Sequence, residues 1–328
     1  MNRRRNYVLT VMVVILMVAV VGVMGWGIAN REWVVDYVRG MNYEPFGEMA
    51  RIRDDLKLTE RGEFLFNATR PELDGEETFN ANCRKEMDVE VAILGCYTGD
   101  SIYVYNVDSD ELEGIRELTT AHELLHAVWA RMDESEKTEL KGALEQVYNE
   151  NKDVLEKELA TYDTSERDEE LYVRVGTEIA ELPIGLEEHY AKIFTNQDLI
   201  VGFYDSYITV FREIEAEMDV LKNEMEVIKT QLDEKTAEYE RRFGQLNADV
   251  VSFNTCAEVA GCFASEGEFY SRREVLMQEQ NALDAMYEEL NNLVNAYNER
   301  VEKYNADVTR SEKLNWEINS NRKPEVNL

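Results

Sequence analysis

The chain has 328 residues and a formal net charge of −32, from 67 acidic and 35 basic side chains. This surplus of negative charge argues against nucleic acid as a partner, because binding phosphates requires a basic surface. With 44% hydrophobic residues the chain can bury a core, and its length allows one or two domains with additional elements.

The N-terminus predicts a single-pass membrane anchor. Three arginines at positions 3–5 precede residues 7–29, which carry no charge and are mostly apolar. About 20 apolar residues suffice to cross a bilayer as a helix. Because basic residues stay on the cytoplasmic side, we expect residues 1–6 in the cytoplasm and everything after the anchor outside it. A cleaved signal peptide is the alternative, although the apolar run is long for one and residues 25–27 match a cleavage site poorly.

Four cysteines follow the anchor. An even number of cysteines outside the cytoplasm predicts disulfides, and sequence proximity pairs Cys83 with Cys96 and Cys256 with Cys262. A thiolate metal site is the alternative, but these spacings do not match the C-x-x-C pattern of zinc ribbons.

Residues 30–200 predict a domain of mixed helix and strand. A helix is expected over 54–61, with a helix end or turn over 58–63. Residues 89–97 and 101–107 are rich in Val, Ile and Tyr, and the Thr-Gly-Asp sequence between them predicts a β-hairpin. Helices are then expected over 112–132, 135–159, 165–181 and 186–194.

Residues 203–312 predict an antiparallel coiled-coil hairpin, followed by a tail over 313–328. Two runs of apolar residues keep a heptad spacing on either side of a short loop that holds Cys256 and Cys262. The first run includes Lys235 and Arg242 at seam positions. The second run is expected to be Leu276, Leu283, Leu290, Val294, Tyr297, Val301, Tyr304 and Val308. The hairpin carries no recognisable chemistry, so we expect a spacer, an oligomerisation element or an arm that docks a protein partner.

The chemistry of the chain is concentrated in the sequence His122-Glu123-Leu124-Leu125-His126. On a helix, residues four apart share one face, so both imidazoles can bind one metal ion. Zinc with three protein ligands keeps an open position and activates water near neutral pH. Glu123 is placed to act as the general base toward that water. The alternative is a helix with two surface histidines.

A third ligand must come from a later helix, since Met132 stands where a further histidine would continue the motif. The candidates are Glu170, Glu178, Glu181 and His189. Glu170 and Glu178 are eight residues apart and would point about 80° apart on one helix. Either could be the ligand, with the other in a supporting position.

The order of anchor, β-hairpin, motif helix and glutamate-bearing helix resembles the gluzincin metallopeptidases, over about residues 112–183. The resemblance favours Glu170 as the third ligand, because the ligand glutamate of that family often precedes a small residue by three positions, which Val173, larger than usual, approximates here. Glu169 stands where the family often has Asn. The resemblance implies an α+β, mostly helical fold with a zincin-like domain and a small β-hairpin or sheet, followed here by the coiled-coil hairpin.

A peptidase also needs a donor for the oxyanion of the transition state. His189 and Tyr190 are the first candidates, followed by Tyr172. The strand over 101–107 could pair with an extended peptide if it lies at the edge of the sheet; an interior strand is the alternative.

These features predict a membrane-anchored, extracytoplasmic zinc metallopeptidase that hydrolyses peptide bonds in peptides or proteins of the cell envelope. The second hypothesis is a non-catalytic, membrane-anchored coiled-coil scaffold whose zincin-like domain binds a partner or a structural metal. A structural zinc site would have four protein ligands, so a fourth ligand near His122 and His126 would favour the scaffold.

Overall fold

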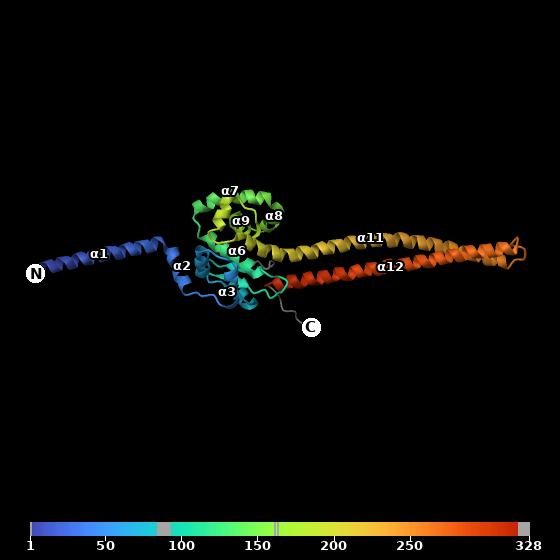
Figure 1. Ribbon diagram of the computed structural model, residues 1–328, viewed down its shortest axis with the longest axis horizontal. Helices are drawn as coiled ribbons and strands as arrows, with labels where there is room; N and C mark the ends of the chain where they lie inside the picture. The colour runs from blue at the N-terminus through green and yellow to red at the C-terminus, as the bar shows by residue number, and fades with distance from the viewer. Residues whose placement is uncertain (1, 84–92, 161, 163, 321–328) are drawn as a thin grey trace. The chain divides into compact units, whose positions relative to one another are not determined.

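The computed structural model describes residues 2–83, 93–160, 162 and 164–320 (Figure 1). Most of these residues are helical, and they include one small sheet and two long C-terminal helices, as the sequence predicted. Two compact units can be distinguished: Met1–Val210 together with Leu314–Leu328, and Phe211–Lys313. The zincin-like character of the first unit stays a prediction.

The helices follow the chain in this order: α1 (Asn2–Ala29), α2 (Arg31–Met41), α3 (Gly47–Asp55), α4 (Glu60–Thr69), α5 (Glu76–Cys83), α6 (Ile115–Ala130), α7 (Glu134–Glu150), α8 (Lys152–Leu159), α9 (Thr164–Glu178), α10 (Ile184–Tyr190), α11 (Gln197–Ala257) and α12 (Glu266–Ile318). Among the residues described, no single helix meets the length and hydropathy expected of a membrane span. Ile15–Ala29 and Arg31–Met41 meet them together, as a pair bent by 88°.

The sheet has three short strands, β1 (Glu72–Asp74), β2 (Gly95–Tyr97) and β3 (Ile102–Tyr105), in the order β1-β3-β2. β2 and β3 form the predicted antiparallel hairpin, with Gly99 at a φ of +90° in its turn. The part of the predicted strand over 89–92 lies outside the described residues. β1 pairs in parallel with β3, so β3 is the central strand. Of the two alternatives for the strand over 101–107, the interior strand is confirmed, and within the described residues β2 is the edge strand on this side.

Two predicted helices have different boundaries in the structure. A continuous helix over 54–61 is wrong, but a break close to the predicted helix end or turn is present: α3 ends at Asp55, Lys57 adopts a left-handed φ of 47°, and Thr59 caps the start of α4. The Thr59 hydroxyl accepts a hydrogen bond from the Gly62 amide at 3.1 Å. The helix expected over 135–159 is divided into α7 and α8 at Asn151, whose side chain donates to the carbonyl of Val147.

Helix α6 is central to the first unit, in contact with α9, β2, β3, α3 and α4. Its apolar residues, including Leu124 and Leu125, are buried in the core. Gly114 caps its N-terminus at a φ of +87°, and a Cβ there would lie 3.1 Å from the ring of Phe203 in α11. Glycine at this position therefore allows α6 to begin against the first turns of α11.

The second unit is an antiparallel helical hairpin of α11 and α12 (Figure 1). Three ion pairs fix its register: Glu224 with Arg300 at 3.1 Å, Lys235 with Glu289 at 2.9 Å and Arg242 with Glu279 at 2.8 Å. The predicted seam of α11 is confirmed, including its two basic residues, which are half-buried.

The predicted seam of α12 is wrong at Val294, which is 43% exposed, while its neighbour Leu293 is half-buried. Arg300 lies close to the seam because it pairs with Glu224 across the hairpin. Both predicted disulfides, Cys83–Cys96 and Cys256–Cys262, are confirmed.

The segment after the hairpin returns to the first unit. The Ser320 hydroxyl donates to the carbonyl of Ile93 at 2.9 Å, and the Asn80 side chain donates to the Ser320 carbonyl at 2.5 Å. Ile93 lies two residues before β2, and Asn80 lies in α5, which the Cys83–Cys96 disulfide joins to β2. The region expected to be a tail thus begins as the end of α12 and then packs beside the sheet.

Candidate metal centre

The two histidines of the motif lie on one face of α6. Their ring centroids are 5.0 Å apart, as expected for residues one turn apart on a helix. Leu124 and Leu125 are fully buried on the other faces, which fixes the rotation of the helix and leaves both imidazoles half-buried. The amphipathic pattern of α6 therefore determines where the histidines point.

A close approach of α9 to α6 brings a carboxylate to these rings. A Cβ at Gly176 would lie 2.5 Å from Tyr190 Cε1 and 2.6 Å from Leu125 Cδ1, so a larger residue would force these side chains, which pack α9 against α10 and α6, to move. One and a half turns earlier on α9, Glu170 reaches the histidines with a side chain that is only 3% exposed. The sequence contained Gly176, but the partner helix that makes the glycine necessary could not be read from it.

His122, His126 and Glu170 form a group that could hold a metal ion, because their ligand atoms all lie within 4.8 Å of one another. His122 Nε2 is 3.8 Å from Glu170 Oε1, and His126 Nε2 is 3.5 Å from Glu170 Oε2. Ligand atoms about 2.1 Å from a tetrahedral zinc ion lie about 3.4 Å from one another. The two histidine–carboxylate distances are within a few tenths of an ångström of this value, and the upper limit of 4.8 Å on the separations in the group would have to shorten around a bound ion.

The ligand atoms are held by a second layer of contacts. His126 Nδ1 is 2.8 Å from Glu169 Oε1, which leaves Nε2 directed at Glu170. Arg174 Nε donates to Glu170 Oε1 at 2.6 Å. Carboxylates that bind the second nitrogen of a histidine fix its tautomer and ring orientation at metal sites. Glu169 and Arg174 are supporting residues that the sequence reasoning did not assign.

The electrostatics of the group favour a positive charge between its members. Burial opposes a charge on His126, but its hydrogen bonds to Glu169 and Glu170 outweigh burial and raise its pKa to about 10. Burial also opposes the charge on Glu170, yet the nearby His122, His126 and Arg174 lower its pKa to about 2. Burial lowers the pKa of His122 to about 3, so this imidazole stays neutral, as a metal ligand must be.

The alternative third ligands are not brought to the histidines. Glu178 accepts a hydrogen bond from Arg174 Nη1 at 2.8 Å, and burial raises its pKa to about 7. Glu181 is exposed beyond the end of α9. Arg174 therefore holds Glu170 and Glu178 at once, and only Glu170 points toward α6.

Glu123 lies beside the sheet, and its side chain is covered: the residue is 7% exposed. A Cβ at Gly95 would lie 2.7 Å from Glu123 Oε1 and 2.7 Å from Thr119 Cγ2. The edge strand β2 thus passes directly over the expected general base. Gly95 is a further residue that sequence reasoning missed, although a glycine at the start of a strand can indicate a close backbone approach.

The three candidate oxyanion donors belong to a buried aromatic cluster. The Tyr190 hydroxyl donates to the Tyr172 carbonyl at 2.6 Å, so its proton is already used within the core. The Tyr172 hydroxyl is 3.0 Å from His189 Nε2, and burial lowers the pKa of His189 to about 4. An oxyanion role for any of the three would require these contacts to break.

Tyr162 is a candidate that the sequence reasoning did not consider. Burial and the nearby Glu170 carboxylate raise the pKa of its hydroxyl to about 12, and it also interacts with Arg174. A neutral phenol beside the third ligand could donate a hydrogen bond to a developing negative charge. Because Tyr162 lies in the loop between α8 and α9, no periodic sequence pattern pointed to it.

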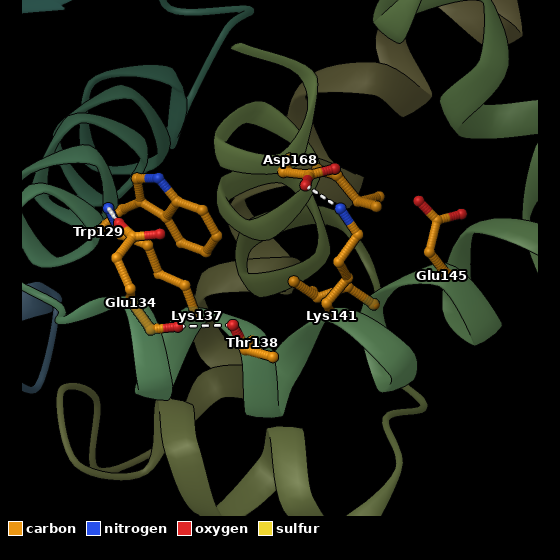
Figure 2. Close-up of a pocket in the computed structure, with 9 residues that line it drawn as sticks. Trp129, Glu134, Lys137, Thr138, Lys141, Glu145 and Asp168 are labelled. Atoms are coloured by element: carbon orange, nitrogen blue, oxygen red, sulfur yellow. Dashed lines mark hydrogen bonds and ion pairs between the residues drawn. The ribbon is translucent and has the colours of Figure 1, made fainter. Parts of the chain in front are cut away.

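A cavity of about 280 Å³ lies between the end of α6, α7 and α9 (Figure 2). Lys141 pairs with Asp168 at 2.6 Å in its wall, and the Lys137 ammonium lies 5.1 Å from the Trp129 ring centroid. None of the three ligand residues lines it. Asp168 and Leu171 flank Glu169 and Glu170 in the chain, so the cavity shares helices with the metal centre but is a separate feature.

No family model matches the chain, and no curated protein or solved structure is significantly similar to it. Its function must therefore be argued from the geometry of the site. The strongest feature is the convergence of residues from two helices, α6 and α9, on one point, with Glu123 close enough to raise the pKa of His126.

Proposed function

We propose that the protein is a membrane-anchored, extracytoplasmic zinc peptidase. The observation that carries the proposal is the group formed by His122, His126 and Glu170, whose ligand atoms lie within 4.8 Å of one another, one residue from the carboxylate of Glu123. The N-terminal apolar segment supports anchoring, and the two disulfides support a location outside the cytoplasm.

Each residue then has a distinct role. His122, His126 and Glu170 would hold the ion, with Glu169 orienting His126 and Arg174 orienting Glu170. Zinc bound there would supply a Lewis acid that makes water nucleophilic near neutral pH. Glu123 would take the proton from the attacking water and return it to the leaving amine.

The edge strand β2 supports a peptide as the substrate. An extended peptide can add to a strand whose outer edge is unpaired, through main-chain hydrogen bonds. β2 is such a strand in the described sheet, and its Gly95 lies against Glu123. A peptide bound along β2 would therefore run past the general base.

The second candidate function, a non-catalytic scaffold, is favoured by one observation: the hairpin over Phe211–Lys313 forms a compact unit with no recognisable chemistry. Within the described residues, however, the metal group has three members, whereas structural zinc sites use four protein ligands. A structural site also has no need of a general base at the position of Glu123.

Metal content tests whether His122 and His126 bind a metal ion or are ordinary surface histidines. The purified full-length protein should hold about one zinc per chain, and His126→Ala should abolish it, because two ligands rarely retain zinc. The chain has three histidines, so His189→Gln is the matched control and should keep its metal. Zinc retained in His126→Ala would contradict the site.

Activity separates the enzyme from the scaffold. Wild type should cleave an unfolded protein, and Glu123→Gln should bind zinc equally but lose about 100- to 10,000-fold of the rate, the usual contribution of a general base. Glu117→Gln, on the same helix, is the control and should cleave normally. If neither wild type nor the variants cleave anything across a broad peptide library, the peptidase proposal fails.

A further inference from the structure

Helix α2 has its polar and apolar faces reversed relative to a helix of a water-soluble domain. Such helices turn an apolar stripe toward the core and polar residues outward. In α2, Asp36 is 6% exposed and Arg39 is half-buried, whereas Val38 is 55% and Met41 67% exposed. By the 100° step of a helix, the polar residues Glu32, Asp36 and Arg39 lie on one side, and Trp33, Tyr37, Val38 and Met41 lie on the other.

The inward polar residues are firmly bound to the rest of the first unit. Asp36 makes a two-point ion pair with Arg131, at 2.7 Å to Nε and 2.8 Å to Nη2. Arg39 donates to the carbonyls of Ala68 at 3.0 Å and Asp100 at 2.8 Å. These contacts, with the packing of α2 on α4, set the rotation of α2 and leave its apolar side outward.

The outward side forms one continuous apolar and aromatic surface. The rings of Trp33 and Tyr37 stack with centroids 5.3 Å apart, and Trp26 meets Trp33 edge-on at 5.6 Å. Phe46, shortly after the helix, is 88% exposed, the most exposed large hydrophobic residue described. Exposed apolar and aromatic side chains gathered in this way mark an interaction site.

The chain itself indicates what covers this surface. α2 follows the apolar helix α1 after one residue, at a bend of 88°, so a helix that crosses a bilayer would be followed by one lying across its surface. Tryptophan and tyrosine prefer the interfacial layer of membranes, and amphipathic helices lie there with the apolar side down. The alternative, that α2 completes a bent span, would place Glu32, Asp36 and Arg39 in hydrocarbon and separate α2 from α4.

We propose that the outward face of α2, together with Phe46, lies in the interfacial layer of the bilayer in which α1 is anchored. This inference rests on the anchoring part of the proposed function and is independent of its metal chemistry. Arg131 is the residue at which α6 ends, so the Asp36–Arg131 pair ties the metal-bearing helix to the membrane-facing one. The preferred substrates would be segments of membrane proteins close to the bilayer surface.

The test places a fluorescent reporter at one of two exposed positions in the first unit. Full-length protein carrying Trp26→Phe and Trp33→Phe, which removes two of the four tryptophans, receives either Phe46→Trp or Ile184→Trp. Ile184 is 72% exposed and begins α10, which makes it a matched control. Each protein is reconstituted into phosphatidylcholine vesicles with or without brominated acyl chains, which quench tryptophan only at close range.

We expect brominated lipid to quench the tryptophan introduced at position 46 at least severalfold more than the one introduced at position 184. Adding Val38→Lys and Met41→Lys should reduce that quenching toward the control. Equal, weak quenching at both positions in vesicle-bound protein would overturn the inference while leaving the anchor intact. Failure of the protein to float with vesicles would overturn both the inference and the anchor, whereas zinc content would bear only on the peptidase proposal. If quenching at position 46 is weak and the protein is a dimer in nanodiscs, a second copy of the chain covers this surface, and the inference is overturned.

Discussion

Two pairs of helices in this protein place charged side chains between them, with opposite outcomes. In the hairpin of α11 and α12, each of Lys235, Arg242 and Arg300 meets one carboxylate of the opposite helix, and the pairs remain partly exposed. Between α6 and α9, two imidazoles and the buried Glu170 converge on one point instead. Charges matched one to one can define a register, whereas charges that converge under burial create a place for a cation.

The largest effect, a loss of zinc affinity at the site between α6 and α9, is expected from Glu170→Gln. Removing the charge of a ligand should weaken zinc binding by more than the roughly 10- to 100-fold that changes in supporting residues cause. Glu178→Gln is the matched control on the same helix and should bind zinc like wild type, because its carboxylate faces Arg174 rather than the histidines. Competition with a chelator measures both affinities. Similar losses in the two variants would mean that the ligand is not Glu170.

The next largest effect is expected from Gly95→Ala. The added methyl would lie 2.7 Å from Glu123 Oε1, so either β2 or the carboxylate must move. A displacement of about 1 Å of a catalytic group can lower a rate about 100-fold, so kcat/KM should fall while zinc content stays at the wild-type value. Gly142→Ala, where a Cβ meets nothing within 4 Å, is the control. An unimpaired Gly95→Ala enzyme would argue against Glu123 as the base.

A smaller effect on stability would sharpen the difference between buried and exposed pairs. Asp36→Asn leaves the Arg131 guanidinium largely buried without its carboxylate, which should lower the free energy of unfolding by about 3 kcal/mol. Glu279→Gln breaks a pair of similar length in the exposed hairpin and should change stability little. Urea unfolding measures both. Equal effects would show that burial does not distinguish the two regions.

The last effect is absent at neutral pH and appears only on acidification. Burial lowers the pKa of His189 from 6.5 to about 4 in the folded protein, so between these values the unfolded chain binds a proton that the folded one does not. Wild type should therefore lose stability from His189 as the pH falls from 6.5 to 4, and lose none above 6.5. In His189→Gln this loss disappears, so the melting temperatures of the two proteins should shift relative to each other on acidification. A constant difference across that range would contradict the assignment.

The motif helix and the hairpin were predictable because their signals are periodic and long. The apolar stripe of α6 and the pair His122 and His126 depend only on neighbours along one helix. The seam of α11 was recognised for the same reason. In α12, Leu293 and Val294 are adjacent and both apolar, so the choice between them depended on the position of Arg300 opposite Glu224, which no sequence pattern shows.

The sequence narrowed the choice of third metal ligand but did not decide between the remaining candidates. Glu170 and Glu178 share a helix about 80° apart, and either could face a site by periodicity alone. What decides between them is tertiary: Gly176 sets how close α9 comes to α6, and Arg174 holds both carboxylates. The strand β1 was missed because two of its three residues are acidic, and it exists through its pairing with β3.

The position of the hairpin within the chain bears on how its length can vary. The first unit is built from residues on both sides of Phe211–Lys313, and the segment beyond it reaches back to Ile93 through Ser320. The register set by Glu224 with Arg300 and Lys235 with Glu289 places residue 210 opposite residue 314. The arm is thus an insertion that leaves and re-enters at neighbouring points. It could lengthen or shorten by whole heptads over evolutionary time without disturbing the ligands on α6 and α9.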